Sequence, residues 1–492
     1  MKLSFYGATQ QVTGSNFLLE HNGKKILVDC GLFQGSKFAE TLNYSPFAYN
    51  PKEIDFVLLT HSHADHSGRL PKLYKDGFRG KVFATKPTID LSAIALDDNL
   101  DLIKDEARKD GHEPLFSSGD LHQIFLLAQG VEYGEELNLG DDIKAIFHNA
   151  GHILGSAIIE VNWKEDKAGK LKSIYFSGDL GNYPVPLLKH YDMPNQADYV
   201  VVESTYGDRL HEKSSDKSRT FQRGIDPAER IFRFPPSSPQ QATGFSGKVR
   251  DKKDILRQVI EETIKKGGAV IIPTFAIERT QELLYELNEL IEHESLPKIP
   301  VFLDSPLAIK LTKVYKSYEN YFNKKVLHDI RAGDDIFSFP GLHLTFSSQE
   351  SRAINEIKFS KVILAGSGMS LGGRILYHER TYLPDPNSTI LFVGYQVEGS
   401  LGRQILDGKK EVKILGQKIP VNCNVRSIGG YSAHADQGML TDWVGKAKQD
   451  GNLKKVFITH GEYSSSTVLA GKIRETMNID SVVPEMGESF EL

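Results

Sequence analysis

The sequence predicts an α/β protein of two domains, in which stacked sheets with outer helices are interrupted by a second domain built on a parallel sheet. Three observations support this fold class. Short apolar runs that end at glycine or polar turns fill residues 1–205, an alternation of strands and helices begins near Asp254, and the first pattern returns near Gly429. We therefore expect a first domain formed by residues 1–205 and 430–492, with the second domain inserted at 206–429.

Length and composition exclude several other classes of protein. The chain has 492 residues, 40% hydrophobic and 25% charged, which is typical of globular proteins and not of disordered chains. No apolar run reaches the ~18 residues of a membrane span and no signal peptide is recognisable, so we expect a cytoplasmic location. Cys30 and Cys423 are too few for a disulfide framework. The net charge of −5 indicates that any nucleic-acid partner is bound at a local site.

The first domain is expected to contain short strands joined by turns. Asn22-Gly23, between two apolar runs at 16–20 and 25–28, is typical of a β-hairpin. Helices separate some of the later strands. Further strands are expected at residues 55–60, 143–147, 157–161, 173–176, 199–203 and 455–459.

The inserted domain is expected to be a parallel α/β domain. A strand at 268–273 precedes a helix at 280–292, and a strand at 299–303 precedes a helix at 308–318. Strands at 361–365 and 389–393 continue the alternation. Residues 221–248 are rich in proline and glutamine, so we expect a flexible surface loop there and assign it no function.

The segment His61-Ser-His63-Ala-Asp65-His66 carries four possible metal ligands within a few positions, directly after an apolar run. Two histidines that are two residues apart at a strand end project to one side, and the following turn can bring the other two ligands to a second point nearby. Imidazole and carboxylate suit zinc or a similar divalent ion, and such a set can hold two ions. A solvated polar turn is the alternative interpretation.

Three other strand ends carry possible ligands beside glycine, namely His152, Asp179 and His460. Ligand sites in α/β folds commonly form at the carboxyl ends of strands, so these side chains can converge on the histidine-rich segment. Each of them alone is equally well explained as a hydrogen-bonded polar residue.

The ordered set of Asp29, the segment His61–His66, His152 and Asp179 resembles the metallo-β-lactamase superfamily. Three later motifs are similar to those of its β-CASP branch of nucleic-acid nucleases: Glu203 in Glu-Ser-Thr-Tyr-Gly, His434 in Ser-Ala-His-Ala-Asp and His460 in Thr-His-Gly-Glu. The resemblance implies an αββα sandwich with an inserted Rossmann-like β-CASP domain. It covers nearly the whole chain apart from residues 221–248, and the compact bacterial ribonucleases related to the cleavage and polyadenylation endonuclease are the most similar form.

The resemblance implies a role for each of these residues. One metal ion would be bound by His61, His63 and His152, the other by Asp65, His66 and His460, with Asp179 bridging the two. Asp29 would support the ligands from behind, and His434, held by Glu203, would give a proton to the leaving oxygen. Family members with histidine in the third motif generally act on RNA, so His460 favours RNA.

We therefore expect a ribonuclease that binds two divalent metal ions, most simply Zn²⁺, with Asp179, His434 and Glu203 as its catalytic residues. Two such ions ~3.5–4 Å apart can activate water, hold a phosphate oxygen and neutralise the charge that develops during attack. The expected reaction is cleavage of single-stranded RNA during processing or decay. Endonucleolytic action is favoured, and the sequence leaves 5′ exonucleolytic action open. The resemblance also allows a homodimer and gives no reason to expect a membrane partner.

A glycine-rich loop, Gly366–Arg374, follows the expected strand at 361–365 and precedes a helix. Such a loop can hold a phosphate with its backbone N–H groups, although strand-to-helix turns use glycine for structural reasons alone. A dinucleotide site is disfavoured because the spacing departs from GxGxxG. Given the resemblance, RNA-backbone contacts are expected from Ser367, Gly368, Gly372, Arg374 and Arg279.

Two other functions stay open from the sequence. A metallohydrolase for a small thioester, lactone or β-lactam shares the histidine-rich turn, but it does not explain the inserted domain or the motifs at Glu203, His434 and His460. A non-catalytic RNA-processing scaffold is the second alternative. Such relatives typically lose metal ligands, whereas all seven ligand positions are filled in this chain.

Overall fold

The computed structural model describes residues 1–35, 37–109, 111–165, 169–211, 252–293, 296–397, 399–428, 431, 433–449 and 452–492. The loop expected at 221–248 lies outside these residues. The chain divides into two compact units. Unit 1 comprises Met1–Leu210, Lys310–Asp334 and Ala433–Leu492, and unit 2 comprises His211–Ile309 and Asp335–Ser432.

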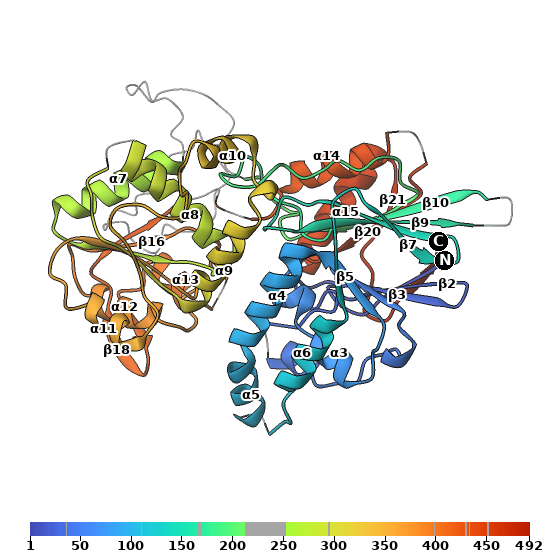
Figure 1. The fold of residues 1–492 in the computed structure, drawn as a ribbon, viewed down its shortest axis with the longest axis horizontal. Helices are drawn as coiled ribbons and strands as arrows, with labels where there is room; N and C mark the ends of the chain where they lie inside the picture. Colours follow the sequence, from blue (N-terminus) through green and yellow to red (C-terminus); the bar gives the residue numbers. More distant parts are fainter. Residues whose placement is uncertain are drawn as a thin grey trace. The chain divides into compact units, whose positions relative to one another are not determined.

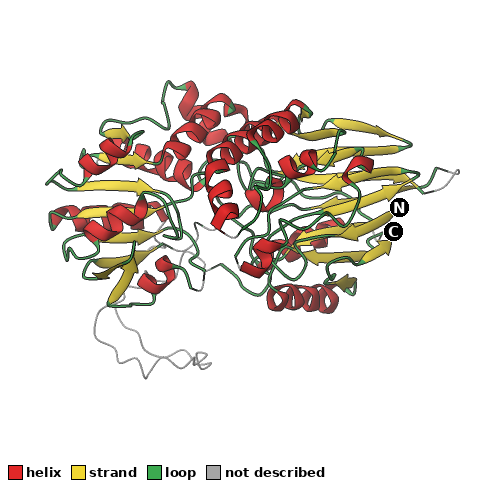
Figure 2. Cartoon of the chain, turned by 90° about the horizontal axis from the view of Figure 1, so that it is seen from below, coloured by secondary structure: helices red, strands yellow, loops and turns green. Residues whose placement is uncertain are grey.

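Two sheets form the middle of unit 1 (Figures 1 and 2). The first sheet has the order β22 (Ser489–Glu491), β1 (Lys2–Phe5), β2 (Phe17–His21), β3 (Lys24–Val28), β4 (Phe56–Leu58), β5 (Lys81–Thr85) and β6 (Ala128–Val131). The second has the order β21 (Asp480–Val482), β20 (Lys455–Thr459), β11 (Tyr199–Glu203), β10 (Leu171–Phe176), β9 (Ala157–Lys164), β8 (Ile143–Asn149) and β7 (Glu136–Gly140). The first and last strands, β1 and β22, pair antiparallel, so the two chain ends lie side by side (Figure 1).

The helices of unit 1 come from two parts of the chain. Those in the first part of the chain are α1 (Lys37–Thr41), α2 (Ala64–Ser67), α3 (Leu70–Lys75), α4 (Lys86–Asp98), α5 (Leu100–Lys109) and α6 (Ser118–Leu126). Those that follow are α10 (Lys324–Arg331), α14 (Gln437–Ala447) and α15 (Tyr463–Met477), and short turns of helix lie at Pro51–Glu53 and Glu319–Tyr321. The helix α9 (Pro306–Ser317) begins in unit 2 and ends in unit 1.

Three buried clusters explain the layering of unit 1. Phe17 of the first sheet and Phe176 of the second belong to one cluster, so the two sheets pack face to face. Leu73 of α3 packs on the other face of the first sheet, and Trp443 of α14 packs on the other face of the second. Because each sheet buries one face against its partner and the other under helices, the predicted αββα sandwich is confirmed.

Unit 2 is built on a parallel sheet with helices on both faces (Figure 1). Its strand order is β14 (Leu342–Leu344), β13 (Val301–Asp304), β15 (Lys361–Ala365), β12 (Ala269–Pro273), β16 (Thr389–Phe392) and β19 (Asn424–Ser427). Its helices are α7 (Lys252–Lys265), α8 (Arg279–Asn288), α11 (Ser348–Ile354), α12 (Ile375–Tyr382) and α13 (Leu401–Leu406), with a π-helical turn at Glu289–His293 and a hairpin of β17 (Glu411–Ile414) and β18 (Gln417–Pro420). The central strands are buried on both faces, as expected for apolar runs in a parallel sheet.

The predicted parallel α/β domain is therefore confirmed, and its elements differ from the expectation mainly at their ends. The helix expected at 280–292 ends as α8 at Asn288, after which the chain continues as a π-helical turn. The predicted domain boundaries of 1–205, 206–429 and 430–492 stay a prediction. Within the described residues, no helix combines the length and the apolar character needed to cross a membrane.

Candidate metal centre

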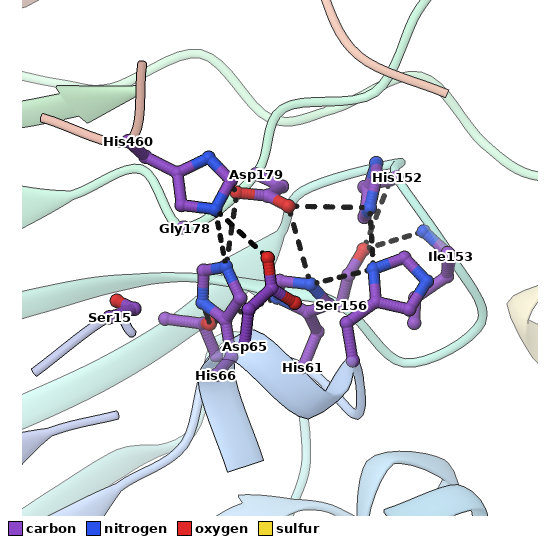
Figure 3. A network of polar contacts seen from close by, with 12 residues as sticks. Ser15, His61, Asp65, His66, His152, Ile153, Ser156, Gly178, Asp179 and His460 are labelled. Carbon is purple, nitrogen blue, oxygen red and sulfur yellow. Dashed lines mark hydrogen bonds and ion pairs between the residues drawn. The ribbon is translucent and has the colours of Figure 1, made fainter. Parts of the chain in front are cut away.

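The expected metal ligands meet at one edge of the sandwich of unit 1 (Figure 3). Asp29 follows β3 and the histidine-rich segment follows β4, which runs parallel to β3. In the second sheet, β8 and β10 are both antiparallel to β9, while β10, β11 and β20 are parallel to one another. β8, β10, β11 and β20 therefore end at the same edge, and His152, Asp179 and His460 follow β8, β10 and β20.

The first group of ligand atoms comes from His61, His63, His152 and Asp179. Nδ1 of His63 lies 3.1 Å from Nε2 of His61 and 3.2 Å from Nε2 of His152. Oδ2 of Asp179 lies 3.4 Å from Nε2 of His61 and 3.5 Å from Nε2 of His152. Four ligands at zinc distances of ~2.0–2.1 Å would be separated by ~3.3 Å in a tetrahedron, so this group fits such an ion.

The second group comes from Asp65, His66 and His460. The Nε2 atoms of His66 and His460 lie 3.1 Å apart, and Oδ2 of Asp65 lies 3.4 Å from Nε2 of His460. Oδ1 of Asp179 lies 3.3 Å from Nε2 of His66. This buried oxygen accepts no hydrogen bond from the described residues. Oδ2 of Asp179 thus lies at the first group of ligand atoms and Oδ1 lies at the second.

Burial and mutual proximity hold the ligands of the first group in the charge states that metals require. Burial, together with the neighbouring His61, lowers the pKa of His63 to about 3, so this imidazole is neutral. Burial and His434 likewise lower the pKa of His152. For Asp179, burial alone would raise the pKa, but the surrounding histidines outweigh it and hold the pKa well below its usual range. The first group therefore combines neutral imidazoles with an ionised carboxylate, the ligand types that divalent ions bind. In the second group, burial alone would lower the pKa of His66, but Asp179 and Asp29 outweigh it and raise the pKa.

Hydrogen bonds behind the ligands fix which imidazole nitrogen faces the centre. Asp29 accepts a hydrogen bond from Nδ1 of His66 at 2.7 Å, and the Thr60 hydroxyl lies 3.1 Å from Nδ1 of His61. The carbonyl oxygen of Ala433 accepts from Nδ1 of His152 at 3.0 Å. These contacts leave Nε2 of each imidazole for the centre. Sequence reasoning found Asp29 but missed Thr60, whose polar side chain at the end of β4 was a usable signal, and Ala433, which acts through its backbone.

The Asp29→Asn variant is expected to bind metal ~10–100-fold more weakly, as is typical when a carboxylate that supports a metal-bound histidine is lost. Asparagine tolerates the left-handed backbone of this position, where φ is 60°, so the fold is expected to persist. Competition with a chromophoric chelator measures the affinity. Asp55→Asn is the matched control, because that carboxylate accepts a hydrogen bond from Lys25 N in the same unit. Equal affinities for Asp29→Asn and wild type would contradict this role.

Gly31 allows the histidine-rich turn to pack against the loop that follows β3. A Cβ atom at Gly31 would lie 1.5 Å from the carbonyl oxygen of Asp65 and 2.7 Å from the backbone nitrogen of His66. Since both neighbours are backbone atoms of the turn, no side-chain movement can relieve the clash. The absence of a side chain at this glycine therefore sets the position of two ligands.

Gly31→Ala is expected to lower the free energy of unfolding by ~1–3 kcal/mol, the scale of overpacking in a well-packed interior. Urea unfolding followed by circular dichroism measures this change. Gly119→Ala is the control, because its Cβ would meet only the Ser117 hydroxyl at 3.5 Å on helix α6. Alanine is favoured over glycine in a helix, so the control is expected to be neutral or slightly stabilising. A Gly31→Ala protein as stable as wild type would contradict the packing argument.

His434 and Glu203 form a pair beside the ligand groups. Nδ1 of His434 lies 3.1 Å from Oε2 of Glu203, and Oε1 of this buried carboxylate also accepts from Leu180 N at 2.6 Å. Burial alone would lower the pKa of His434, but Glu203 and Asp179 outweigh it and raise the pKa to about 9. The His434 side chain remains 20% exposed. It is therefore a protonated imidazole that reaches solvent at the edge of the centre.

The residues expected to contact RNA in unit 2 are placed differently from the metal ligands. The Arg374 guanidinium donates to Asp304 Oδ1 at 2.7 Å and to the carbonyl oxygens of Thr345 and Phe346. Arg279 is buried and paired with Glu282, so its guanidinium is used inside the unit. Ser367, Gly368 and Gly372 lie in the loop after β15. The role of these residues in RNA contact stays a prediction.

Comparison with family models identifies three matched regions. The metallo-β-lactamase superfamily domain matches residues 18–174 and the β-CASP domain matches residues 280–405. The model described as a Zn-dependent metallo-hydrolase RNA specificity domain matches residues 418–484. These regions cover parts of each segment of unit 1 and most of the parallel sheet of unit 2.

Comparison with known proteins finds relatives along the full chain. A ribonuclease of Thermus thermophilus is 36% identical, with 99% of each chain covered. An RNase J-like protein of Methanocaldococcus jannaschii is 31% identical, covering 99% of this chain and 98% of its own. The transcription termination factor FttA of Methanosarcina mazei is 29% identical over 98% of this chain and 70% of its own. A crystal structure of an Enterococcus faecalis protein of unknown function, 13% identical, has the same fold with a TM-score of 0.54 over 100% of this chain and 99% of its own.

Proposed function

The chain belongs to the β-CASP ribonuclease branch of the metallo-β-lactamase superfamily, and from this premise we propose that it cleaves single-stranded RNA at phosphodiester bonds by metal-dependent hydrolysis. The observation that carries the proposal is the complete set of seven ligand positions beside the His434–Glu203 pair. A scaffold protein has no need for such a set. A small-molecule hydrolase has no need for the β-CASP domain.

We propose that the centre holds two divalent ions, most simply Zn²⁺. His61, His63 and His152 would hold one ion, Asp65, His66 and His460 the other, and Asp179 would bridge them through its two oxygens. Ions bound there supply Lewis acidity and a nucleophilic water at neutral pH. The protein's own part is to keep these side chains in fixed positions through the hydrogen bonds that their Nδ1 atoms form with Asp29, Thr60 and Ala433.

His434 is proposed to give a proton to the 3′-oxygen that leaves when the phosphodiester bond breaks. Glu203 accepts from Nδ1 of His434, which orients the ring and leaves Nε2 as the atom that carries the donated proton. The buried Glu203 carboxylate also stabilises the charged imidazolium before the proton is transferred. The proposed roles of Glu203 and His434 are thus orientation and general acid catalysis.

The proposal extends to the cell and to the assembly. Cys30 and Cys423 are both buried and form no disulfide, which suits the reducing cytoplasm that we propose as the location. We also propose a homodimer and keep the domain division at 1–205, 206–429 and 430–492. Light scattering of the purified protein measures the oligomeric state.

The function is tested by incubating matched, end-labelled single-stranded RNA and DNA with the purified protein and added zinc or manganese. Cleavage of RNA by wild type and not by Asp179→Ala supports the proposal, and internal fragments support endonucleolytic action. Released mononucleotides would instead indicate exonucleolytic action. If the protein bound two metal ions but cleaved neither RNA nor DNA, the proposed ribonuclease function would be contradicted and a small-molecule hydrolase would be favoured. Protein that binds no metal would favour the scaffold.

A further inference from the structure

The carboxyl edge of the parallel sheet in unit 2 exposes several large apolar side chains. All strands of this sheet are parallel, so the segments that follow them lie along one edge. Among the described residues of these segments, Phe275, Phe346, Leu371, Tyr395 and Val397 are each between 37% and 64% exposed. Clustered apolar exposure on a folded domain commonly marks a binding surface, and this edge is where parallel α/β sheets bind ligands. We refer to Phe275, Phe346, Leu371 and Tyr395 as the aromatic edge.

The centre of the aromatic edge is a connected and well-ordered surface. A Cβ atom on Gly368 would lie 2.7 Å from the Phe275 ring, and one on Gly394 would lie 3.5 Å from it, so the ring rests on both glycines. Nε2 of Gln396 donates to the carbonyl oxygens of Gly368 and Gly394 at 3.0 and 3.1 Å. These bonds tie the loops after β15 and β16 together beneath Phe275, with Tyr395 next to Gly394 in the chain.

Several polar groups of the glycine-rich loop beside this surface form hydrogen bonds within the loop. The Ser367 hydroxyl accepts from Leu371 N at 3.0 Å and from Gly372 N at 3.2 Å, while Ser367 N donates to the Gly372 carbonyl at 3.1 Å. Ser370 N also donates to the Ser367 carbonyl. These bonds occupy the backbone N–H groups of Ser367, Ser370, Leu371 and Gly372, so these four are not available to a phosphate. The side chain of Leu371 is exposed.

Near the loop, the Asp304 carboxylate and the Arg374 guanidinium form an ion pair. The Asp304 carboxylate is buried and accepts from Arg374 at 2.7 Å, from His378 Nε2 at 2.7 Å and from the Ser351 hydroxyl at 2.6 Å. The same arginine holds the carbonyl of Phe346, which positions that residue beside the loop. The Asp304–Arg374 pair is therefore directed into the unit, while the exposed Glu350 carboxylate accepts from Phe346 N and Ser347 N beside the apolar side chains.

We propose that the aromatic edge binds RNA by stacking bases on Phe275 and Tyr395, and this inference rests on the proposed ribonuclease function. Bases of a single strand present flat faces that stack on exposed aromatic rings with little dependence on sequence. Phe275 and Tyr395 follow the neighbouring strands β12 and β16, so their rings can receive bases of one strand. The aromatic edge would thus bind unpaired bases, whereas the contacts expected from the sequence are to the RNA backbone and stay a separate prediction.

The test measures equilibrium binding of a labelled single-stranded RNA to metal-free protein by fluorescence anisotropy, so that no cleavage intervenes. Phe275→Ala and Tyr395→Ala are each expected to weaken binding ~5- to 150-fold, the range of a lost base stack. Phe275→Tyr and Tyr395→Phe keep a ring and are expected to bind like wild type. Phe359→Ala is the matched control, because Phe359 is 63% exposed but precedes β15 and so lies at the opposite edge.

A second RNA of the same length, with abasic sites in place of its bases, separates stacking from backbone contact. Stacking predicts that Phe275→Ala and Tyr395→Ala bind the abasic strand as wild type does, with an unchanged dependence on salt. An equal loss on both strands would overturn the proposal in favour of backbone contact. Unchanged RNA binding would also overturn it, and a change only in the oligomeric state would identify the edge as a contact between protein copies.

Failure of this inference is distinguishable from failure of the ribonuclease function. Wild type that cleaves RNA while Phe275→Ala binds normally overturns only the aromatic edge. If the wild-type protein cleaved no RNA, the proposed ribonuclease function would be overturned. The comparison of RNA binding between wild type and the alanine variants would still test base stacking.

Discussion

Asp179→Ala is expected to lose bound metal and RNA cleavage together. The two oxygens of Asp179 face separate ligand groups, with Oδ2 3.4 Å from Nε2 of His61 and Oδ1 3.3 Å from Nε2 of His66. Removing the carboxylate takes one ligand from each group and a negative charge from a fully buried site. Metal ions supply several kcal/mol of transition-state stabilisation, so activity is expected to fall at least ~10³-fold.

Metal content is measured by mass spectrometry of the dialysed protein, and cleavage is measured on end-labelled RNA. Asp198→Ala is the control, since this carboxylate accepts from Ser173 N and pairs with Lys454 in the same unit. Asp179→Asn keeps the shape of the side chain and is expected to lose metal as well, which excludes misfolding as the cause. A variant that kept two metal ions per chain would contradict the bridging role.

His434→Ala is expected to keep its metal but to cleave RNA ~10²-fold more slowly or worse, the scale of general acid catalysis. The imidazole is held by Glu203 at 3.1 Å and lies outside both ligand groups. Its removal therefore takes away the proton donor and leaves the ligand sets complete. Glu203→Gln is expected to slow cleavage in the same direction, because the neutral amide holds the imidazolium less strongly.

His148→Ala is a closely matched control for this variant. His148 pairs with Glu160 at 2.7 Å in the same unit, and its side chain is 23% exposed against 20% for His434. It lies on β8 and outside the ligand groups, so its loss is expected to leave cleavage unchanged. If His434→Ala cleaved RNA at the normal rate, the assigned role would be wrong, and if it lost metal, His434 would be a ligand.

The features that the sequence predicted are those with a local pattern. Alternating strands and helices predicted the parallel sheet of unit 2, and the density of histidines after β4 predicted the site in unit 1. Asp29 was found through the family resemblance, and the structure places it against His66. In each case one short stretch of sequence carries the signal, because the physical cause is local periodicity or ligand spacing.

The features that escaped prediction depend on contacts between distant segments. β1 pairs with β22, which lies almost 490 residues later in the chain. No local sequence pattern predicts this pairing. The carbonyl of Ala433 orients His152 without any side-chain signature. The Ser367 hydroxyl accepts from the N–H groups of Leu371 and Gly372 within the glycine-rich loop, and side-chain hydrogen bonds of this kind cannot be recognised from residue spacing.

The late position of His460 governs when the centre can form during synthesis. His460 follows β20, which lies between β11 and β21 in the second sheet, and it stands 394 residues after its neighbour His66. A ribosome adding ~5–20 residues per second needs roughly 20–80 s to cover that interval. During this time the emerging polypeptide is tethered to its own messenger with one ligand group incomplete. Translation itself therefore delays completion of the ligand set until the codons for β20 and His460 have been read.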